Sequence, residues 1–444
     1  MRIMKALFFI LPYLALVLVT FLPWLRLEKR ERRFLLILSA FALFLHTIFA
    51  LCMQKMPVAR YGPFFFIDEY GYDKYSWGIA REWRSGNFPN LWTDQYLGTL
   101  HTGWNRILAA IYYVFGHHPR LGIALNILAG ALLTPLAFFT TRELFREAAG
   151  AAPKENLANA IPPQKIKAMF PLSPEFIAAL IATVHLSFAY WSSFLLRDTI
   201  LAVMFLASLY LILTLHHRMN LWNMGALILI LLGLALLRVY SVGFLLAGPF
   251  VYLLFIHKKK GLFWIALAAG MLFLLAGRIY IPLRDYEDQL VYSFLNNLPD
   301  AGNTPLGSLI HFLRGLPRFF LGPYAWYVSP GPPVIDYMLY PGQWILYLLI
   351  LPFALKGIFL CMRENIREAL YLVIPCMLSM FLFLLAYGGS VPRQRLYLEP
   401  IFVIFAAWGL SRKDRARRVP LLWYGFLVLF IAAHSLSAWK RGLW

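Results

Sequence analysis

The chain is poor in charge, and negative charge is the scarcer sign. Of its 444 residues only 14% are charged and 21 are Asp or Glu, whereas 61% are hydrophobic. The mean hydropathy is +0.65. About a quarter of the residues of a soluble protein are charged, so the charges here are too few to cover a water-facing surface. The composition excludes a soluble domain and predicts that lipid surrounds most of the molecule.

Cysteine is also scarce. Cys52, Cys361 and Cys376 lie within or at the ends of apolar stretches, and they are too few and too far apart for a disulfide framework or a metal site. We interpret them as packing residues. The N-terminus begins like a signal peptide, but its apolar stretch is long and ends in basic residues without a small-residue cleavage site. We therefore expect it to remain as a membrane helix.

Long apolar runs, by contrast, recur along the whole chain. A run of about 20 such residues crosses the hydrocarbon core as a helix, because its backbone polar groups must bond within the segment. The predicted fold class is all-α: a polytopic integral membrane protein, with a single transmembrane domain over 1–444 and about 12 transmembrane helices. Very tight turns are expected around Arg197-Asp198 and Arg238. The predicted spans are 5–25, 34–52, 120–141, 174–190, 199–215, 221–237, 240–256, 261–278, 343–360, 369–387, 396–410 and 420–438.

The formal net charge is +20, and the basic residues orient the bundle. If the spans alternate, the basic segments fall on one side, which the positive-inside rule makes cytoplasmic. Most Lys and Arg are then loop residues that touch anionic lipid, and a minority are candidates for holding a phosphate. The basic runs are short and lie between apolar spans, so no nucleic-acid partner is expected. The basic segments are 26–33, 142–173, 216–220, 257–261, 361–368 and 411–418.

This orientation divides the connecting segments. The first outer loop, 53–119, contains two stretches with apolar and aromatic residues at helical spacing, beginning at Tyr72 and Trp104. We expect amphipathic helices in the membrane interface, with ordinary packed surface helices as the alternative. The second outer loop, 279–342, is rich in Pro, Gly and aromatic residues and is predicted to cap the site. The segment 142–173 is interpreted as a cytoplasmic linker.

Acidic residues at the outer ends of spans are candidates for chemistry. Asp68 and Glu69 directly precede the first amphipathic helix, where a partly desolvated carboxylate could act as a general base; an N-cap is the alternative. Asp73 follows on the same helix as a candidate substrate-binding residue. Asp198 lies at another outer turn and could bind an acceptor, share a metal with Asp68 or orient a loop. Its alternative role is a salt bridge with Arg197, which is itself a substrate-binding candidate.

Basic residues at the outer ends are the second group of candidates. Arg238, Arg393 and Arg395 are on the side where positive charge is not expected, and their guanidinium groups match phosphate oxygens. The alternative is that they reach lipid head groups. His101 precedes the second amphipathic helix; a single histidine makes no metal site, so it is either structural or a substrate hydrogen-bond partner.

The order of these motifs resembles the GT-C superfamily of membrane glycosyltransferases, in particular the protein O-mannosyltransferase and aminoarabinose-transferase-like branch, family 39. An Asp-Glu pair leads into YDKYSWGIAREW, and WNRILAAIYYVFG is followed by RLGIALNILAGALLTPLAFFTTRELF. YWSSFLLRDTILAVMFLASLYLIL is similar to the family's span–turn–Asp–span unit, and RQRLYLEPIFVIFAAWGL to its Arg-containing late unit. Together they cover most of residues 60–410.

The resemblance implies an inverting hexosyl- or pentosyltransferase of cell-envelope polysaccharide biosynthesis. Its donor would be a polyprenyl-phosphate-linked sugar, its acceptor a lipid, glycan or protein hydroxyl. The enzyme would lie in the plasma (inner) membrane with its site on the periplasmic or extracellular face. Asp68 would be the general base supported by Glu69, and Asp198 the second acidic position. The lipid phosphate would be held by Arg238, Arg393 and Arg395.

Two departures from the family pattern stand out. The acidic pair follows the second span rather than the first, and His101-Thr102-Gly103 replaces the usual Lys-Pro-Pro or His-Pro-Pro. Relatives both with and without a metal requirement exist, so a divalent Mg²⁺ or Mn²⁺ ion is left open.

Two other readings remain. A polysaccharide polymerase or ligase would use outer arginines and depend less on an early Asp-Glu pair. A transporter or flippase of lipid-linked sugars would show inverted repeats and charges near the membrane midplane, and neither is evident.

Overall fold

The computed structural model describes residues 2–55, 63–86, 102–146, 173–255, 349–387 and 395–412, with a few more between 418 and 425. Every regular element in these segments is a helix, and residues 349–363 are helical as well. The principal elements are α1 (Arg2–Phe21), η1 (Leu22–Arg26), α2 (Lys29–Lys55), α3 (Ile67–Arg84), α4 (Thr102–Phe115), α5 (Pro119–Leu144), α8 (Pro174–Thr183), α9 (Leu186–Ser192), α10 (Asp198–His217), α11 (Leu221–Phe255), η4 (Arg367–Ala369), α15 (Leu370–Tyr387) and α16 (Glu399–Ser411).

Five of the described helices are long and apolar enough to cross a membrane, and there are six if α8 and α9, bent by 46° at their junction, form one span. The prediction of an α-helical membrane protein with several spans is confirmed at this level. The predicted span 261–278 and nearly all of 420–438 lie outside the described residues. The five helices are Lys29–Lys55, Pro119–Leu144, Asp198–His217, Leu221–Arg238 and Arg367–Leu384.

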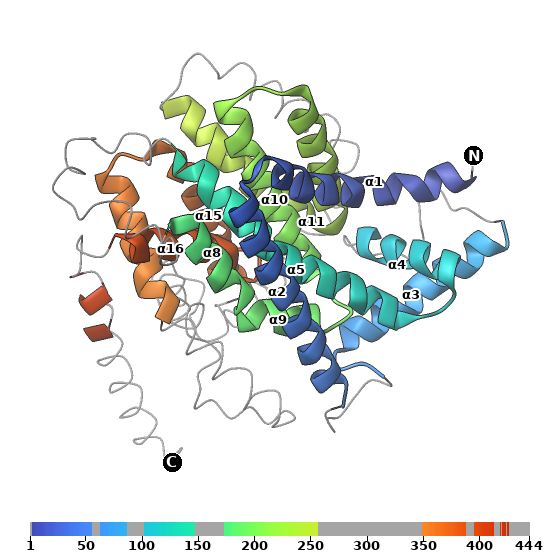
Figure 1. The fold of residues 1–444 in the computed structure, drawn as a ribbon. Coiled ribbons are helices and arrows are strands. Elements are labelled where there is room, and N and C mark those ends of the chain that lie inside the picture. The colour runs from blue at the N-terminus through green and yellow to red at the C-terminus, as the bar shows by residue number, and fades with distance from the viewer. Residues whose placement is uncertain are drawn as a thin grey trace, which may run out of the picture.

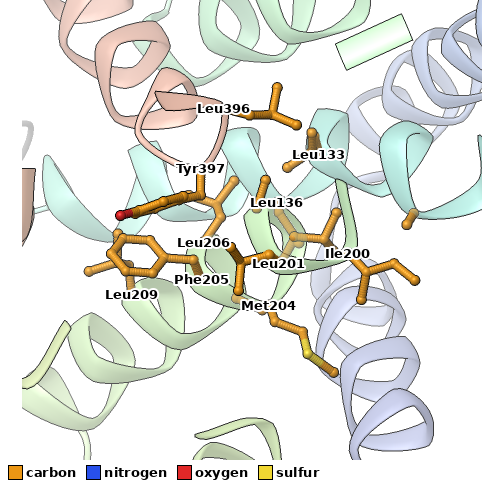
Figure 2. Packing of buried hydrophobic residues seen from close by; sticks show 14 of the residues in the cluster. Leu133, Leu136, Ile200, Leu201, Met204, Phe205, Leu206, Leu209, Leu396 and Tyr397 are labelled. Carbon is orange, nitrogen blue, oxygen red and sulfur yellow. The ribbon is translucent and has the colours of Figure 1, made fainter. Parts of the chain in front are cut away.

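Helix α10 is the centre of the bundle and packs mainly on α5 and α11 (Figure 1). Of its span, 94% is buried inside the protein, compared with 28% for α2. Apolarity alone does not explain this difference, because the mean hydropathy of the span is 2.1 for α10 and 2.4 for α2, and lipid can cover an apolar face as well as protein can. Figure 2 shows Leu201 and Phe205 of α10 packed beside α5 and Tyr397, whose ring centroid is 5.1 Å from that of Phe205.

Helix α11 reverses direction at a single residue, Arg238, whose backbone is non-helical (φ −163°, ψ 93°). The first half runs antiparallel to α10, since it starts next to the end of that helix and brings Arg238 back to Asp198 at its beginning. The second half returns, because the Tyr252 ring lies 5.3 Å from His216 near the end of α10. The two spans predicted around a very tight turn at Arg238 are therefore the two halves of α11.

Helices α3 and α4, which come from the predicted first outer loop, lie together at one side of the bundle (Figure 1). The Tyr112 hydroxyl of α4 donates a hydrogen bond of 2.7 Å to Asp73 of α3, and His117 Nε2 lies 3.0 Å from the same carboxylate. Trp77 stacks on His117 with ring centroids 4.9 Å apart. Asp73, a predicted substrate-binding residue, thus links α3 to α4, and its contacts fix the pair of helices as a unit.

The end of the bundle at which α10 finishes is rich in basic residues. His217 lies 3.2 Å from the Glu143 carbonyl at the end of α5, and Arg142 forms an ion pair with Glu31 at the start of α2. Three of the basic segments named above therefore meet at one end. The acidic candidates and Arg238 lie at the other end, about 30 Å away along α10 at 1.5 Å per residue.

Candidate functional site

The turn between α9 and α10, residues 193–197, is the centre of the candidate site. Side chains from three helices hold its backbone. Asn126 of α5 donates hydrogen bonds of 2.6 Å to the carbonyls of Phe194 and Leu196. Trp104 Nε1 of α4 donates to the Leu195 carbonyl at 3.2 Å. Because peptide groups outside a helix need partners when buried, these bonds fix the turn in one conformation.

Glu69 is the third clamp on this turn. One carboxylate oxygen accepts a hydrogen bond of 2.6 Å from the Leu195 N–H, and the other accepts bonds of 3.0 Å from the N–H groups of Phe65 and Phe66. The side chain is only 2% exposed. Burial raises the pKa of the Glu69 carboxyl above its ordinary value, while the three backbone bonds act in the opposite direction. Its acceptor capacity is directed at backbone, so Glu69 positions the turn against the start of α3.

Arg197, the last residue of the turn, has a buried guanidinium. It is 5% exposed, and among the residues that the structure describes neither Nε nor Nη1 has a hydrogen-bond partner. Its guanidinium carbon lies 5.9 Å from the ring centroid of Tyr72, one turn beyond Glu69 in α3. Burial, followed by the effect of Arg238, lowers the pKa of Arg197, although Tyr72 and Asp198 favour the charged form. Such a group is suited to an anion with planar pairs of oxygens.

Asp198 forms an ion pair with Arg238, whereas a salt bridge with Arg197 was the alternative role considered from the sequence. The Arg238 Nη2 atom lies 3.4 Å from Asp198 Oδ1, and both side chains are buried. The guanidinium of Arg238 also lies 5.4 Å from the Tyr240 ring. Because Arg238 is the apex of α11, this ion pair ties that apex to the first turn of α10.

The start of α4 reaches the same place because residue 103 is a glycine. A Cβ at Gly103 would clash with the backbone of Leu236, two residues before Arg238. One departure from the family pattern, Gly103, therefore has a packing role: it lets α4 lie directly against α11 so that Trp104 reaches the turn.

Arg395 belongs to a different cluster. Its Nε lies 3.5 Å from Glu399 Oε1, and His185 Nδ1 lies 3.6 Å from the other oxygen of that carboxylate. His185 stands at the break between α8 and α9, and all three side chains are buried. Arg395 thus pairs with the first residue of α16, and the same carboxylate faces His185 at the break between α8 and α9.

The remaining candidates are placed as follows. Asp68 is partly exposed in the first turn of α3, directly before Glu69. His101 and Arg393 lie outside the described residues, as does the second outer loop, 279–342. Within the segments that the structure describes, no three His, Cys, Asp or Glu side chains gather as metal ligands would.

Three of the residues that build the site were not predicted from the sequence. Asn126 lies within the predicted span 120–141, and Tyr72 and Trp104 begin the two predicted amphipathic stretches. Asn126 carried a signal nonetheless, because it is the one amide in the apolar run LGIALNILAGALL, and polar residues within spans commonly bond across helices.

Comparison with models of known protein families finds no match for this chain, and a search of curated proteins finds none either. The likeness to the GT-C superfamily is therefore a resemblance in the order of motifs.

Proposed function

We propose that the protein is an inverting membrane glycosyltransferase, a hexosyl- or pentosyltransferase that uses a polyprenyl-phosphate-linked sugar. The observation that carries this proposal is the buried Arg197 guanidinium, whose Nε and Nη1 have no hydrogen-bond partner within the described segments. It lies beside the helix that bears Asp68. A buried charge without a partner is costly, and a phosphate supplies the oxygen acceptors that a guanidinium fits.

The chemistry follows from these groups. The acceptor hydroxyl oxygen attacks the anomeric carbon, and the Asp68 carboxylate takes its proton as general base. The bond between the anomeric carbon and the phosphate oxygen breaks, and its electron pair leaves with the phosphate. Arg197 stabilises the charge that develops on the leaving group, while Glu69 and Arg238 act as positioning residues. The acceptor is a hydroxyl of a lipid, glycan or protein.

The proposal includes a full architecture of about 12 spans in a GT-C-like bundle, located in the plasma (inner) membrane. The site would face the periplasm or the exterior. Two observations support this orientation. The basic segments meet at the opposite end of α10, as the positive-inside rule requires of the cytoplasmic end, and a lipid-linked donor can reach a site at the membrane surface sideways from the bilayer. His101, Arg393 and the outer loop 279–342 are proposed to complete the site, and a divalent ion is compatible with the resemblance.

The test is sugar transfer in proteoliposomes with a panel of radiolabelled polyprenyl-phosphate hexoses and pentoses. Asp68→Asn should reduce transfer by about 10²- to 10⁴-fold, the usual contribution of a general base, without weakening binding of the lipid donor. Arg197→Gln should weaken donor binding and transfer together. Arg120→Gln, an exposed arginine at the start of α5, is the matched control and should behave as the unchanged protein.

The same preparation separates the alternatives. Transfer that survives Asp68→Asn but fails in Arg197→Gln would favour a polymerase or ligase mechanism. Net movement of labelled lipid across the vesicle without any transfer product would make the protein a transporter and overturn the proposal.

A further inference from the structure

An open pocket lies at the opposite end of α10 from the candidate site. It has a volume of about 530 Å³ and lies at the short turn that joins α10 to α11. The two ends of α10 are about 30 Å apart at 1.5 Å per residue, which is the thickness of the hydrocarbon core. The residues that line the pocket are Arg26, Thr214, Arg218, Met219, Asn220, Leu221, Trp222 and Asn223.

The pocket lining is cationic and rich in hydrogen-bond donors. Arg26 comes from η1 and Arg218 from the turn after α10, so two arginines from distant parts of the chain line one space. No acidic side chain belongs to this lining among the described residues. Asn220 Oδ1 accepts a 2.9 Å hydrogen bond from the Trp222 N–H and caps the start of α11. A pocket with this lining favours an anion.

Exposed apolar side chains beside the pocket indicate that the anion belongs to a lipid. Leu221 is 79% exposed and Trp222 is 86% exposed, although both begin a helix that is long and apolar enough to cross a membrane. Exposed tryptophan at the end of a membrane span is typical of the head-group region. Leu25, beside Arg26, is exposed as well. The arginines are therefore presented next to a surface suited to acyl chains rather than to water alone.

We propose that this pocket binds the phosphate head group of an anionic lipid in the leaflet opposite the candidate site. Arg26 and Arg218 would hold the phosphate oxygens, and Leu221 and Trp222 would lie against the glycerol and upper acyl chains. A soluble phosphate compound carries the same charge but has no acyl chain to contact the exposed side chains of Leu221 and Trp222. This inference goes beyond the proposed glycosyl transfer and does not depend on it.

The test uses the full-length protein in phosphatidylcholine nanodiscs that contain brominated phosphatidylglycerol in increasing fractions. Bromine quenches tryptophan fluorescence at contact, and subtracting the signal of Trp222→Phe isolates Trp222 from the other 13 tryptophans (the chain has 14). Half-maximal quenching of Trp222 should occur at a fraction about thirtyfold lower for brominated phosphatidylglycerol than for brominated phosphatidylcholine. This estimate follows from about 1 kcal/mol for each of the two arginines near an anionic surface, with about 1.4 kcal/mol for each factor of ten.

The variants decide whether the two arginines cause the preference. Arg26→Gln/Arg218→Gln should abolish it, and Arg26→Lys/Arg218→Lys should keep part of it, because lysine retains the charge without the planar fork. Arg363→Gln/Arg367→Gln also removes two positive charges, from exposed positions just before and within η4. This control variant should keep the preference for brominated phosphatidylglycerol.

Three outcomes would overturn the proposal. The first is equal quenching by the two brominated lipids in the unchanged protein. The second is an unaltered preference in Arg26→Gln/Arg218→Gln. The third is relief of the Trp222 quenching by inorganic phosphate, to the same extent in the unchanged protein and in Arg363→Gln/Arg367→Gln. Free phosphate would then be the ligand of the site.

Discussion

At its first residue α10 carries Asp198, buried and 3.4 Å from Arg238. Just past its last residue Arg218 is exposed beside a pocket with no acidic lining among the described residues. The two ends belong to one apolar helix, yet the charge is buried in an ion pair at one end and exposed at the other. A charge inside the protein needs an oppositely charged partner, because removing it from water costs several kcal/mol per ion. Where it remains at the surface, water and lipid head groups solvate it.

Breaking the buried pair should have the largest effect. Asp198→Ala leaves the Arg238 guanidinium buried without its carboxylate, and we expect it to lower the free energy of unfolding by about 3–5 kcal/mol. Unfolding of the detergent-solubilised protein with rising denaturant measures this. The double variant Asp198→Ala/Arg238→Leu should recover much of the loss, since it removes both charges. A single-variant loss below about 1 kcal/mol would mean that the pair is solvated, and the contrast between the two ends would fail.

Glu69→Ala should have the second-largest effect on the free energy of unfolding. It leaves the N–H groups of Phe65, Phe66 and Leu195 without their acceptor, and we expect a loss of about 3 kcal/mol, since one buried unsatisfied group alone costs about 1–3 kcal/mol. Glu69→Gln keeps one carbonyl oxygen and should lose less.

The pH dependence of protein stability gives a further test of the role of Glu69. Burial raises the pKa of Glu69 in the folded protein, so the folded state binds the proton more tightly than the unfolded state. Stability is therefore highest below the ordinary glutamate pKa and falls as the pH rises through the raised one. Glu69→Gln should remove this part of the pH dependence in thermal unfolding curves recorded from acid to neutral pH. An unchanged profile would contradict the assignment.

Asn126→Ala should have an intermediate effect. It removes the two donors that hold the carbonyls of Phe194 and Leu196, and we expect a loss of about 2 kcal/mol. Asn223→Ala, at the opposite end, is the matched control, and a change within about 0.5 kcal/mol is expected there. Thermal unfolding of the two variants side by side gives the comparison, and equal losses would argue against a special role for the turn at 193–197.

Arg26→Gln/Arg218→Gln should have the smallest effect on stability, within about 0.5 kcal/mol for each exposed substitution. The same denaturant titration measures it. A loss comparable to that of Asp198→Ala would show that these arginines are structural, and the two ends of α10 would no longer differ in kind.

The sequence predicted the helical class, the central apolar spans and the reversal at Arg238, because each depends on local runs of apolar residues. It also predicted that Asp68, Glu69 and Asp198 lie at the ends of helices. It could not give their partners. Glu69 bonds to Leu195, 126 residues away, and Arg238 to Asp198, 40 residues away. Such pairings arise only when the helices pack, so carboxylates that look alike in the sequence receive different surroundings.

The single-residue apex at Arg238 constrains how this gene can change. If one residue added there were taken up into the helix, the following half-helix would rotate by about 100°, the angle per residue of an α-helix with 3.6 residues per turn. The Tyr252 face would then leave its place beside His216 and α15, and an apolar outer face would replace it in the interior. Length changes should therefore be excluded from this stretch during divergence and should accumulate in the outer and inner connecting segments instead.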